Sequence, residues 1–267
     1  MNNEIKVLYD AHVIRQKSGF FNGEKFVHFM NHDQGNNRIR ELLTSDRPVL
    51  IARHGGTELV TVCQYDLDNR VPGVRTLCSG SGFFPCDEEL AKKWSKLYLE
   101  SLSGVDCLCE WNHRFGKYGK LQHMFSKYTP AADIINNINV LTPFFDQDPW
   151  TIALKGKRVL VIHPFANTIK AQYEKRELLF DNPNVLPEFE KLETIKTVVN
   201  ITGNPVAGYN TWFEAYDDLK QKIAECEFDV ALLGCASYGL ITASYIKSLG
   251  KSAVHIGGGL QLLFGIR

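Results

Sequence analysis

The chain of 267 residues carries 30 basic and 30 acidic side chains, so its formal net charge is +0, and 44% of its residues are hydrophobic. These values are typical of a globular protein and argue against nucleic-acid partners, which bind strongly basic surfaces. No apolar run approaches the roughly 20 residues of a membrane span, and the first residues lack the apolar core of a signal peptide. We therefore expect a cytoplasmic protein without a transmembrane segment.

The sequence has seven cysteines, an odd number, and none of them forms a Cys-x-x-Cys pair. Zinc sites built from cysteine usually need that spacing. Cys107 and Cys109, for example, alternate within an apolar segment of strand character. We interpret the cysteines as reduced residues of the core.

Residues 1–35 are polar and show no hydrophobic period, so we interpret them as an N-terminal lead or capping segment. The α/β region that follows, from 36 to 267, is treated as one domain, because no repeat or low-complexity linker interrupts it. In its first half we predict, in chain order, a helix at 37–44, a strand at 48–52, a helix at 59–65, a glycine- and proline-rich loop at 72–82, a helix at 87–102 and a strand at 106–111.

The second half begins with a polar stretch at 116–129 that we interpret as helix and loop. Further along we predict a strand at 138–141, a strand at 157–163, a helix at 169–179, a strand at 197–201, a helix at 209–225, a strand at 228–234, a helix at 240–247 and a strand at 252–257. Strands that alternate with helices predict an α/β fold with a doubly wound, mainly parallel Rossmann-like sheet and helices on both faces.

Polar side chains follow several of these strands. Arg53 and Glu58 follow the first strand, Glu110 ends the second, His163 ends the strand at 157–163, and Gly234 ends the strand at 228–234. Because the carboxyl ends of parallel strands share one edge, we expect these groups to line one cleft for a polar ligand. Glycines at such an edge let backbone N–H groups approach a phosphate.

The segment from Arg53 to Glu58 has the clearest chemistry. Arg53 can donate two parallel hydrogen bonds to a phosphate, and Gly55 and Gly56 leave the backbone accessible to a ligand. Glu58 can bind a divalent cation or act as a base. A tight turn with an exposed ion pair is the alternative. His163 suits either a structural histidine or a catalyst.

Two further segments have a functional and a structural interpretation. The loop at 234–239 lacks the ending of a P-loop and a proper Gly-x-Gly-x-x-Gly fingerprint, so it is either a binding loop or a packing turn. Gln172, Lys175 and Arg176 share one helix face, which is either a phosphate-binding face or a solvated basic one.

Together these motifs resemble bacterial and viral glycosyltransferase-like proteins of the GT-D type. The matching segments are Arg-x-Gly-x-x-Glu at 53–58, Gly-Phe-Phe-Pro at 82–85, His-Pro-Phe at 163–165, Gln-x-x-x-Arg at 172–176, Gly-x-x-x-Tyr-Gly at 234–239 and His-x-Gly-Gly-x-x-Gln-x-x-Phe-Gly at 255–265. The resemblance covers residues 48–267. It implies that the chain continues in a larger multidomain protein, since such proteins are expected to extend beyond this point.

The resemblance implies transfer of a sugar from a nucleotide-sugar donor (a UDP- or GDP-sugar) to a glycan or polysaccharide acceptor, with Mn²⁺ or Mg²⁺ as the cofactor. From their chemistry, Glu58, Glu110 and His163 are the catalytic candidates for deprotonating the acceptor hydroxyl, and the resemblance implies that Glu58 is also a metal ligand. The implied binding residues are Arg53, Gly55, Gly56, Gln172, Lys175, Arg176, Gly234, Ser237, Tyr238, His255, Gly257, Gly258 and Gln261.

The sequence departs from the GT-D metal motif, Asp-x-Glu, at one position. Gly56 stands where the aspartate is expected, so metal binding is weaker, relies on Glu58 and diphosphate oxygens, or is absent. The missing aspartate motivates a second hypothesis, a non-catalytic nucleotide- or sugar-binding domain. A Rossmann-type oxidoreductase or a nucleotide hydrolase is a third hypothesis, and the poor dinucleotide fingerprint argues against the oxidoreductase.

Overall fold

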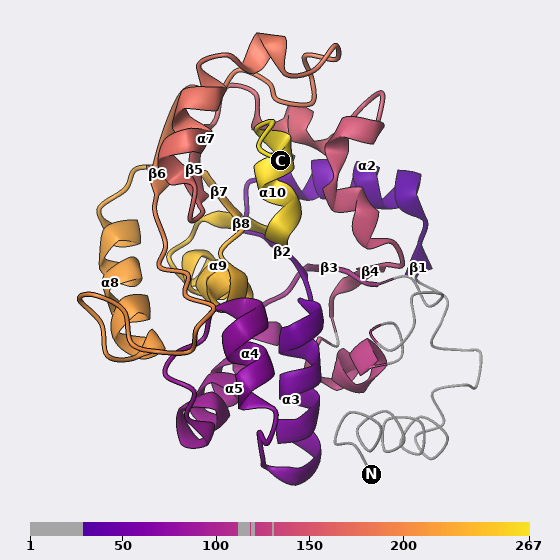
Figure 1. Cartoon of the computed structure of the whole chain (residues 1–267). Helices are drawn as coiled ribbons and strands as arrows, with labels where there is room; N and C mark the ends of the chain where they lie inside the picture. The colour runs from indigo at the N-terminus through magenta and orange to yellow at the C-terminus, as the bar shows by residue number, and fades with distance from the viewer. Residues whose placement is uncertain (1–28, 112–117, 119–120, 130) are drawn as a thin grey trace.

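The computed structural model describes residues 29–111, 118, 121–129 and 131–267, which form one eight-stranded sheet (Figure 1). Every pair of neighbouring strands is parallel, in the order β1-β4-β3-β2-β8-β7-β5-β6. The strands are β1 Phe29–Met30, β2 Leu50–Arg53, β3 Cys107–Cys109, β4 Asp133–Ile135, β5 Arg158–Ile162, β6 Lys191–Ile195, β7 Val230–Leu233 and β8 Ser252–His255. The predicted α/β class with a doubly wound parallel sheet is confirmed. Most of the predicted lead at 1–35 lies outside the described residues.

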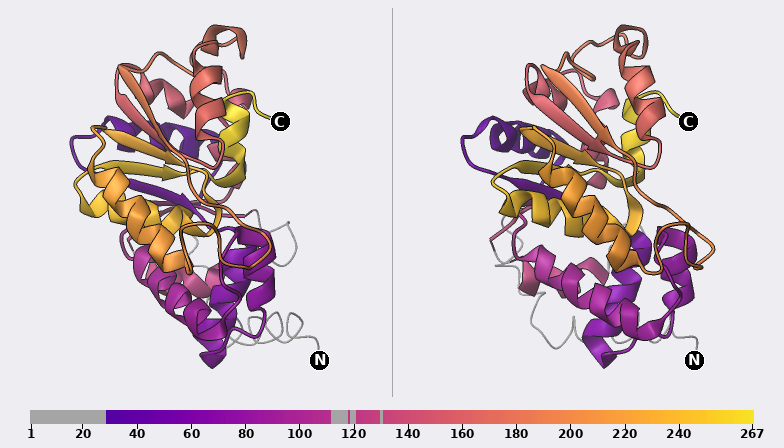
Figure 2. Two further views of the ribbon diagram at one scale, coloured as in Figure 1. Left: turned by 60° about the vertical axis from the view of Figure 1, so that its left-hand side comes forward. Right: turned by 90° about the vertical axis from the view of Figure 1, so that its left-hand side faces the viewer.

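Helices cover both faces of this sheet (Figure 2). The α-helices are α2 His32–Thr44, α3 Gly56–Asp68, α4 Val74–Ser81, α5 Glu88–Leu102, α7 Ala166–Tyr173, α8 Trp212–Ala224, α9 Gly239–Ser248 and α10 Leu260–Leu263. The 3-10 helices are η2 Gln122–Tyr128, η3 Ile138–Leu141, η4 Pro143–Phe145, η5 Trp150–Leu154, η6 Arg176–Leu178, η7 Ala236–Tyr238 and η8 Gly257–Gly259. Within the described residues, no helix is long and apolar enough to cross a membrane.

Alternation along the strands builds two hydrophobic cores. In β2, Leu50 and Ala52 face the core that contains α3, α5, α8 and α9, whereas Ile51 faces the core that contains α2, α7 and α10. All three side chains are fully buried. Successive residues of a strand point to opposite faces, so a strand covered on both faces is apolar throughout. This explains why the buried strands were recognisable as uninterrupted apolar runs.

Capping residues fix the starts of the helices. The side chain of Asn31 accepts a hydrogen bond from the Gln34 backbone N–H at 2.9 Å, and the Gln34 side chain accepts one from the Asn31 N–H, which is a complete capping box. Helix α2 therefore begins at His32, five residues before the predicted start. The side chains of Asp87 and Thr211 accept hydrogen bonds from the backbone N–H groups of Leu90 and Glu214 and so cap α5 and α8, close to the predicted starts.

Three predicted elements were wrong. Residues 138–141 form η3 instead of a strand, because Asn137 caps the segment by accepting the Asn139 N–H at 3.0 Å. Residues 197–201 lie in no strand; the strand is β6, an edge strand with the polar sequence Lys-Leu-Glu-Thr-Ile. The predicted loop at 72–82 contains α4, a short helix that tolerates Gly80 and ends at Gly82 with a φ of 68°.

The C-terminal βαβ unit matches the prediction, and its last strand has a central place. β7, α9 and β8 follow one another along the chain, and β8 lies between β7 and β2. One cysteine prediction was wrong, because Cys78 and Cys86 are joined by a disulfide between α4 and the turn that precedes α5. The other five cysteines form no disulfide, and four of them are buried.

Candidate functional site at the carboxyl edge of the sheet

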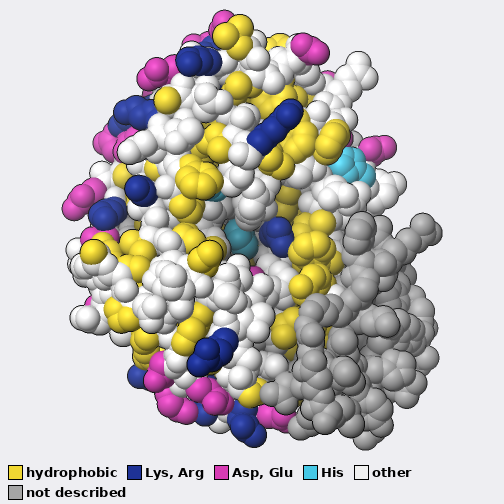
Figure 3. Space-filling view, viewed as in Figure 1, with side chains coloured by type: hydrophobic (Ala, Val, Ile, Leu, Met, Phe, Trp, Pro, Cys, Tyr) yellow, Lys and Arg dark blue, Asp and Glu magenta, His cyan; other side chains and the backbone are white. Residues whose placement is uncertain are grey.

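Five strands deliver predicted site residues to one edge of the sheet. Arg53 ends β2, Glu110 follows β3, His163 follows β5, Gly234 follows β7, and His255 ends β8. β3, β2, β8, β7 and β5 are consecutive in the sheet, so these residues lie side by side at the carboxyl ends. On the face shown in Figure 3 the surface is hollowed near its centre, where a basic side chain and a histidine lie behind a rim of hydrophobic side chains.

Arg53 is held at this edge by its neighbours. Its Nε and Nη2 donate hydrogen bonds to the carbonyl oxygen of His54 at 3.1 and 2.9 Å, and its guanidinium lies 4.9 Å from the ring centre of Trp111. Trp111 Nε1 donates to the same His54 oxygen at 2.9 Å. Burial lowers the pKa of Arg53, against an opposing effect of Glu58, but a guanidinium stays charged in a protein. The remaining nitrogen, Nη1, lies on the side of Gly257.

Glu58 lies at the start of α3, folded back over Gly55. A Cβ on Gly55 would collide with the Glu58 carboxylate, so a larger residue at 55 needs that carboxylate to move. Burial raises the pKa of Glu58, whereas its own backbone N–H, the charge of Arg53 and a hydrogen bond from Ser81 oppose that rise. An acidic side chain in the first turn also favours the helix. Glu58 is thus both a helix-start residue and the carboxylate coupled to Arg53.

Gly56, the position of the expected metal-binding aspartate, faces an aromatic ring. A Cβ on Gly56 would lie 2.7 Å from Cζ of Tyr118, so a larger residue requires that ring to move. Within the part of the chain that the structure describes, no three His, Cys, Asp or Glu side chains are grouped as metal ligands. Divalent cations of this kind prefer several oxygen ligands. Glu58 alone therefore does not fit the expected cation site.

Glu110 is buried next to β2 and differs from Glu58 in its surroundings. Gln122 Nε2 donates to Glu110 Oε2 at 3.2 Å and to the Trp111 carbonyl oxygen at 2.7 Å. Burial raises the pKa of Glu110 to about 8, and no neighbouring charge contributes. The Glu110 carboxyl is therefore protonated at pH 7, although it lies at the same edge as Arg53.

His163 lies where β5, β7 and β8 meet. Its Nδ1 accepts a hydrogen bond from the backbone N–H of Phe165 at 3.0 Å, so the neutral ring carries its proton on Nε2. A Cβ on Gly234 would lie 2.8 Å from His163 Cδ2 and 2.7 Å from the carbonyl oxygen of Gly257, so glycine is needed at 234. Burial lowers the pKa of His163 to about 4. The ring is therefore neutral at pH 7 and suited to donate a hydrogen bond.

His255 and His54 are buried below the edge and face away from solvent. The His255 ring packs directly on Gly239 at the start of α9. His54 Nδ1 is hydrogen-bonded to the hydroxyl of Tyr98 at 2.9 Å. Burial, assisted by the charge of Arg53, lowers the pKa of each histidine to about 3. Both rings are neutral packing groups that support the neighbouring loops.

Ser237 and Tyr238 point into the core that contains α8. Ser237 Oγ accepts a hydrogen bond from Trp212 Nε1 at 2.9 Å, and its carbonyl oxygen accepts one from Trp94 Nε1 at 3.1 Å. The Tyr238 ring stacks on Trp212 with ring centres 4.6 Å apart. The loop after β7 thus uses these two predicted binding residues for packing.

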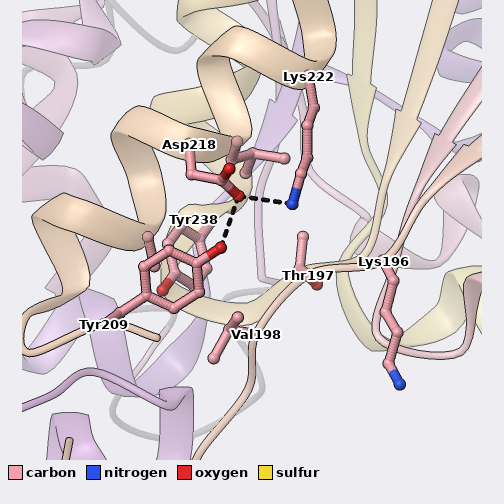
Figure 4. Close-up of a pocket in the computed structure, with 9 residues that line it drawn as sticks. Lys196, Thr197, Val198, Tyr209, Asp218, Lys222 and Tyr238 are labelled. Atoms are coloured by element: carbon pink, nitrogen blue, oxygen red, sulfur yellow. Dashed lines mark hydrogen bonds and ion pairs between the residues drawn. The ribbon is translucent and has the colours of Figure 1, made fainter. Parts of the chain in front are cut away.

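Tyr238 also lines a small cavity on the far side of that loop (Figure 4). Its volume is about 20 Å³, which is room for about one water molecule. Asp218 accepts hydrogen bonds there from the Tyr209 hydroxyl at 2.7 Å and from Lys222 at 2.6 Å, and Thr197 lines the opposite wall. The cavity is too small for a nucleotide.

The predicted basic face of the helix after His163 is not at the edge. Gln172 Nε2 donates to the carbonyl oxygen of Phe264 at 3.2 Å and so holds the segment after α10. Lys175 is exposed, and Arg176 pairs with Glu177 at 3.1 Å. Helix α7 starts at the carboxyl edge of the sheet, and these residues lie at and beyond its other end. They are therefore about two helical turns away from the edge.

The last predicted residues lie in the turn after β8. Gly258 is exposed, with no neighbouring group within 4 Å of the place that a Cβ would take, and Gln261 is half-buried in α10. The sequence analysis missed two functional groups. One is the His54 carbonyl oxygen, which accepts hydrogen bonds from Arg53 and Trp111, although the position of His54 directly after a strand was a signal for it. The other is Tyr118, for which the surrounding polar stretch offered no signal.

The fold and the edge define a doubly wound α/β protein with a hollow suited to an anionic ligand. Its three-dimensional fold is similar to that of several solved structures. A structure described as a new glycosyltransferase (domain of unknown function 1792) from Streptococcus sanguinis shares 12% identity, with a TM-score of 0.53, over 90% of this chain and 86% of that chain. A selenomethionine-substituted structure of a domain of unknown function 1792 shares 9% identity, with a TM-score of 0.52, over 95% and 82% of the two chains.

A third structure is described as a domain 1792 with a distinct glycosyltransferase fold. It shares 10% identity, with a TM-score of 0.50, over 86% of this chain and 78% of that chain. No protein-family profile and no curated protein matches the sequence. The likeness therefore establishes the fold, and it confirms the fold that the GT-D resemblance predicts.

Proposed function

We propose that the chain is a glycosyltransferase that moves a sugar from a nucleotide-sugar donor to a hydroxyl group of a glycan acceptor. The observation that carries this proposal is the meeting of Arg53, His163, Gly234 and Gly257 at the ends of four adjacent strands. A buried cation, a neutral N–H donor and close-packed glycines suit the diphosphate of such a donor. The similarity to structures described as glycosyltransferases supports the same reaction class.

In the reaction, the bond between the anomeric carbon and the diphosphate oxygen breaks, and a bond to the acceptor oxygen forms. Arg53 stabilises the negative charge that develops on the leaving diphosphate, because its own charge is fixed and partly shielded from water. His163 donates its Nε2 proton as a hydrogen bond to the donor, since Nδ1 is already an acceptor. His163 is thus better suited to binding than to the role of base.

The acceptor hydroxyl must lose its proton to a carboxylate. Glu58 is the carboxylate whose pKa responds to Arg53, so it lies close to the bound diphosphate in this proposal. Burial raises the pKa of Glu110 to about 8, so this carboxyl holds a proton at pH 7 and is not suited to accept another. We therefore assign the base to Glu58, whose neighbour Arg53 helps to keep it ionised.

The test is release of nucleoside diphosphate or monophosphate from UDP-, GDP-, CMP- and dTDP-sugars in the presence of mixed glycan acceptors. Glu58→Gln should lower turnover by about 100-fold or more, the typical contribution of a general base. Glu100→Gln, on the exposed surface of α5, is the matched control. Nucleotide binding without turnover in the wild type would instead favour the non-catalytic binding domain, which the glycine at position 56 motivates.

A further inference from the structure

We propose that this site binds the donor diphosphate without a divalent cation, with the fixed charge of Arg53 in the place of the metal. The inference rests on the proposed function, because it concerns how the same donor is held. It departs from the cation that the GT-D resemblance implies.

The first support is the set of available ligands. A cation that bridges a diphosphate is usually held by one or two carboxylates in addition to the phosphate oxygens and water. Glu58 is the one carboxylate of the expected pair, and it is buried, folded over Gly55, and already accepts hydrogen bonds from Ser81 and its own backbone N–H, so little of it is left to hold a cation. Within the described ranges no cluster of three potential metal ligands exists.

The second support is that the space for the other carboxylate is filled. A Cβ on Gly56 would lie 2.7, 2.9 and 3.0 Å from three atoms of the Tyr118 ring. Real Cβ atoms do not approach other heavy atoms to less than about 3 Å, because contacts at that distance are repulsive. An aspartate at 56 therefore needs the Tyr118 ring to move.

The third support is that the same aromatic group positions Arg53. The rings of Tyr118 and Trp111 are in contact, with centres 5.3 Å apart, and Trp111 lies under the Arg53 guanidinium. The His54 carbonyl oxygen anchors both Trp111 and Arg53. The Tyr118 ring, which fills the space beside Gly56, therefore belongs to the same packed group that holds the Arg53 guanidinium.

The fourth support is the direction of the remaining donor. Nε and Nη2 of Arg53 are occupied by His54, whereas Nη1 would lie 3.0 Å from a Cβ on Gly257. The glycine at 257, with a φ of 76°, leaves that space open. A diphosphate oxygen that enters beside Gly257 meets a permanent positive charge, which needs no metal for neutralisation.

The experiment is calorimetric titration of the wild-type chain with UDP, GDP, CDP and dTDP, each in Mn²⁺ and in EDTA. We expect the Kd of the nucleotide that binds to be the same within about threefold in the two conditions. Arg53→Gln should weaken that binding by about 10- to 100-fold, the usual range for loss of a charge-assisted hydrogen bond. Arg53→Lys, which keeps the charge without the fork, should recover part of the affinity.

A variant designed to bind a metal tests the inference that Tyr118 fills the space of the second carboxylate. In the double variant Gly56→Asp with Tyr118→Ala, the second carboxylate has room, and we expect Mn²⁺ to tighten nucleotide binding by tenfold or more. Each single variant is the control for the other. Direct Mn²⁺ binding, measured by electron paramagnetic resonance without nucleotide, should appear in the double variant and not in the wild type.

The outcomes separate the two proposals. A tenfold or greater tightening by Mn²⁺ in the wild type, abolished by EDTA, overturns the metal-independent site and leaves the glycosyltransferase proposal intact. Absence of binding for all four nucleotides in both conditions, together with no turnover of any of the nucleotide sugars, overturns the proposed function, and this inference with it. The wild-type titration and turnover assay decide between these results even where the double variant does not fold.

Discussion

Nη1 of Arg53 would lie only 3.0 Å from a Cβ on Gly257, although β2 and β8 are far apart in the sequence. Arg53 ends β2 and Gly257 lies in the turn just after the adjacent strand β8, so the side chain of one and the backbone of the other enclose the same space. In the proposed function this space receives the diphosphate.

The first prediction concerns that contact. Gly257→Ala should lower the free energy of unfolding by about 1–2 kcal/mol, because an alanine is strained at a φ of 76°, and should also raise the nucleoside diphosphate Kd about tenfold by displacing Arg53. Gly250→Ala is the matched control, since Gly250 has a φ of 77° and no neighbouring group within 4 Å of an added Cβ. Chemical denaturation and calorimetry distinguish the two variants. Equal nucleotide affinities would show that the contact does not matter for binding.

The second prediction uses the buried carboxyl of Glu110. Its pKa is about 8 in the folded protein against an ordinary value of 4.5, so between these pH values the folded state holds a proton that the unfolded chain has lost. Stability must then fall as pH rises from 4.5 to 8, by up to about 1.4 kcal/mol per pH unit. Glu110→Gln removes this loss, and Gln122 keeps an acceptor.

Urea unfolding at several pH values measures this effect. The variant should gain stability over the wild type progressively from pH 4.5 to about 8 and stay level above that. Glu100→Gln, an exposed change of the same chemistry, should show no such pH-dependent gain. Parallel stability curves for Glu110→Gln and the wild type would contradict the raised pKa.

The third prediction concerns acid stability. Burial lowers the pKa of His54 to about 3 from an ordinary 6.5, so its contribution to stability is present above pH 6.5 and is lost as pH falls towards 3. His54→Phe removes this acid sensitivity but leaves the Tyr98 hydroxyl without its partner, at a cost of about 1–3 kcal/mol at pH 7. The stability difference between wild type and variant should therefore narrow between pH 6.5 and 4. A difference that is constant with pH would refute the assignment.

The fourth prediction concerns the loop after β7. Ser237→Ala should lower the free energy of unfolding by about 1–3 kcal/mol, because Trp212 Nε1 would be left buried without an acceptor. Ser248→Ala, an exposed serine at the end of α9, should cost less than about 0.5 kcal/mol. Thermal or urea unfolding measures both. Similar small losses would mean that the tryptophan finds another partner.

The helices and strands that were predictable from sequence are those with one clear local pattern, either an apolar run or helical spacing behind a capping residue. β5 and β7 are apolar runs buried on both faces, and α5 and α8 have helical spacing behind a capping residue. β4 and β6 were missed because each has charged residues and lies towards an edge of the sheet. For such strands the pairing partner decides the structure, and that partner is not visible in the local sequence.

Some residues of the candidate site were predictable from sequence and others were not. Arg53, His163 and Gly234 follow recognisable strands, so the parallel-sheet rule brought them to one edge. Ser237 and Tyr238 lie in the same kind of loop, yet their side chains turn towards Trp212, which depends on long-range packing. Tyr118 was not predictable, because nothing near it in the sequence indicates that its ring meets Gly56.

The place of β8 between β2 and β7 has a consequence for biosynthesis. Ile51 pairs with Val254, about 200 residues later, so the two halves of the sheet are joined by the last of these strands to leave the ribosome. Until then β2 and β7 each present an unpaired edge, which invites pairing with other nascent chains. Arg53 also meets Gly257 only after this strand is inserted, so the proposed diphosphate site forms only once residues 252–257 have been synthesised.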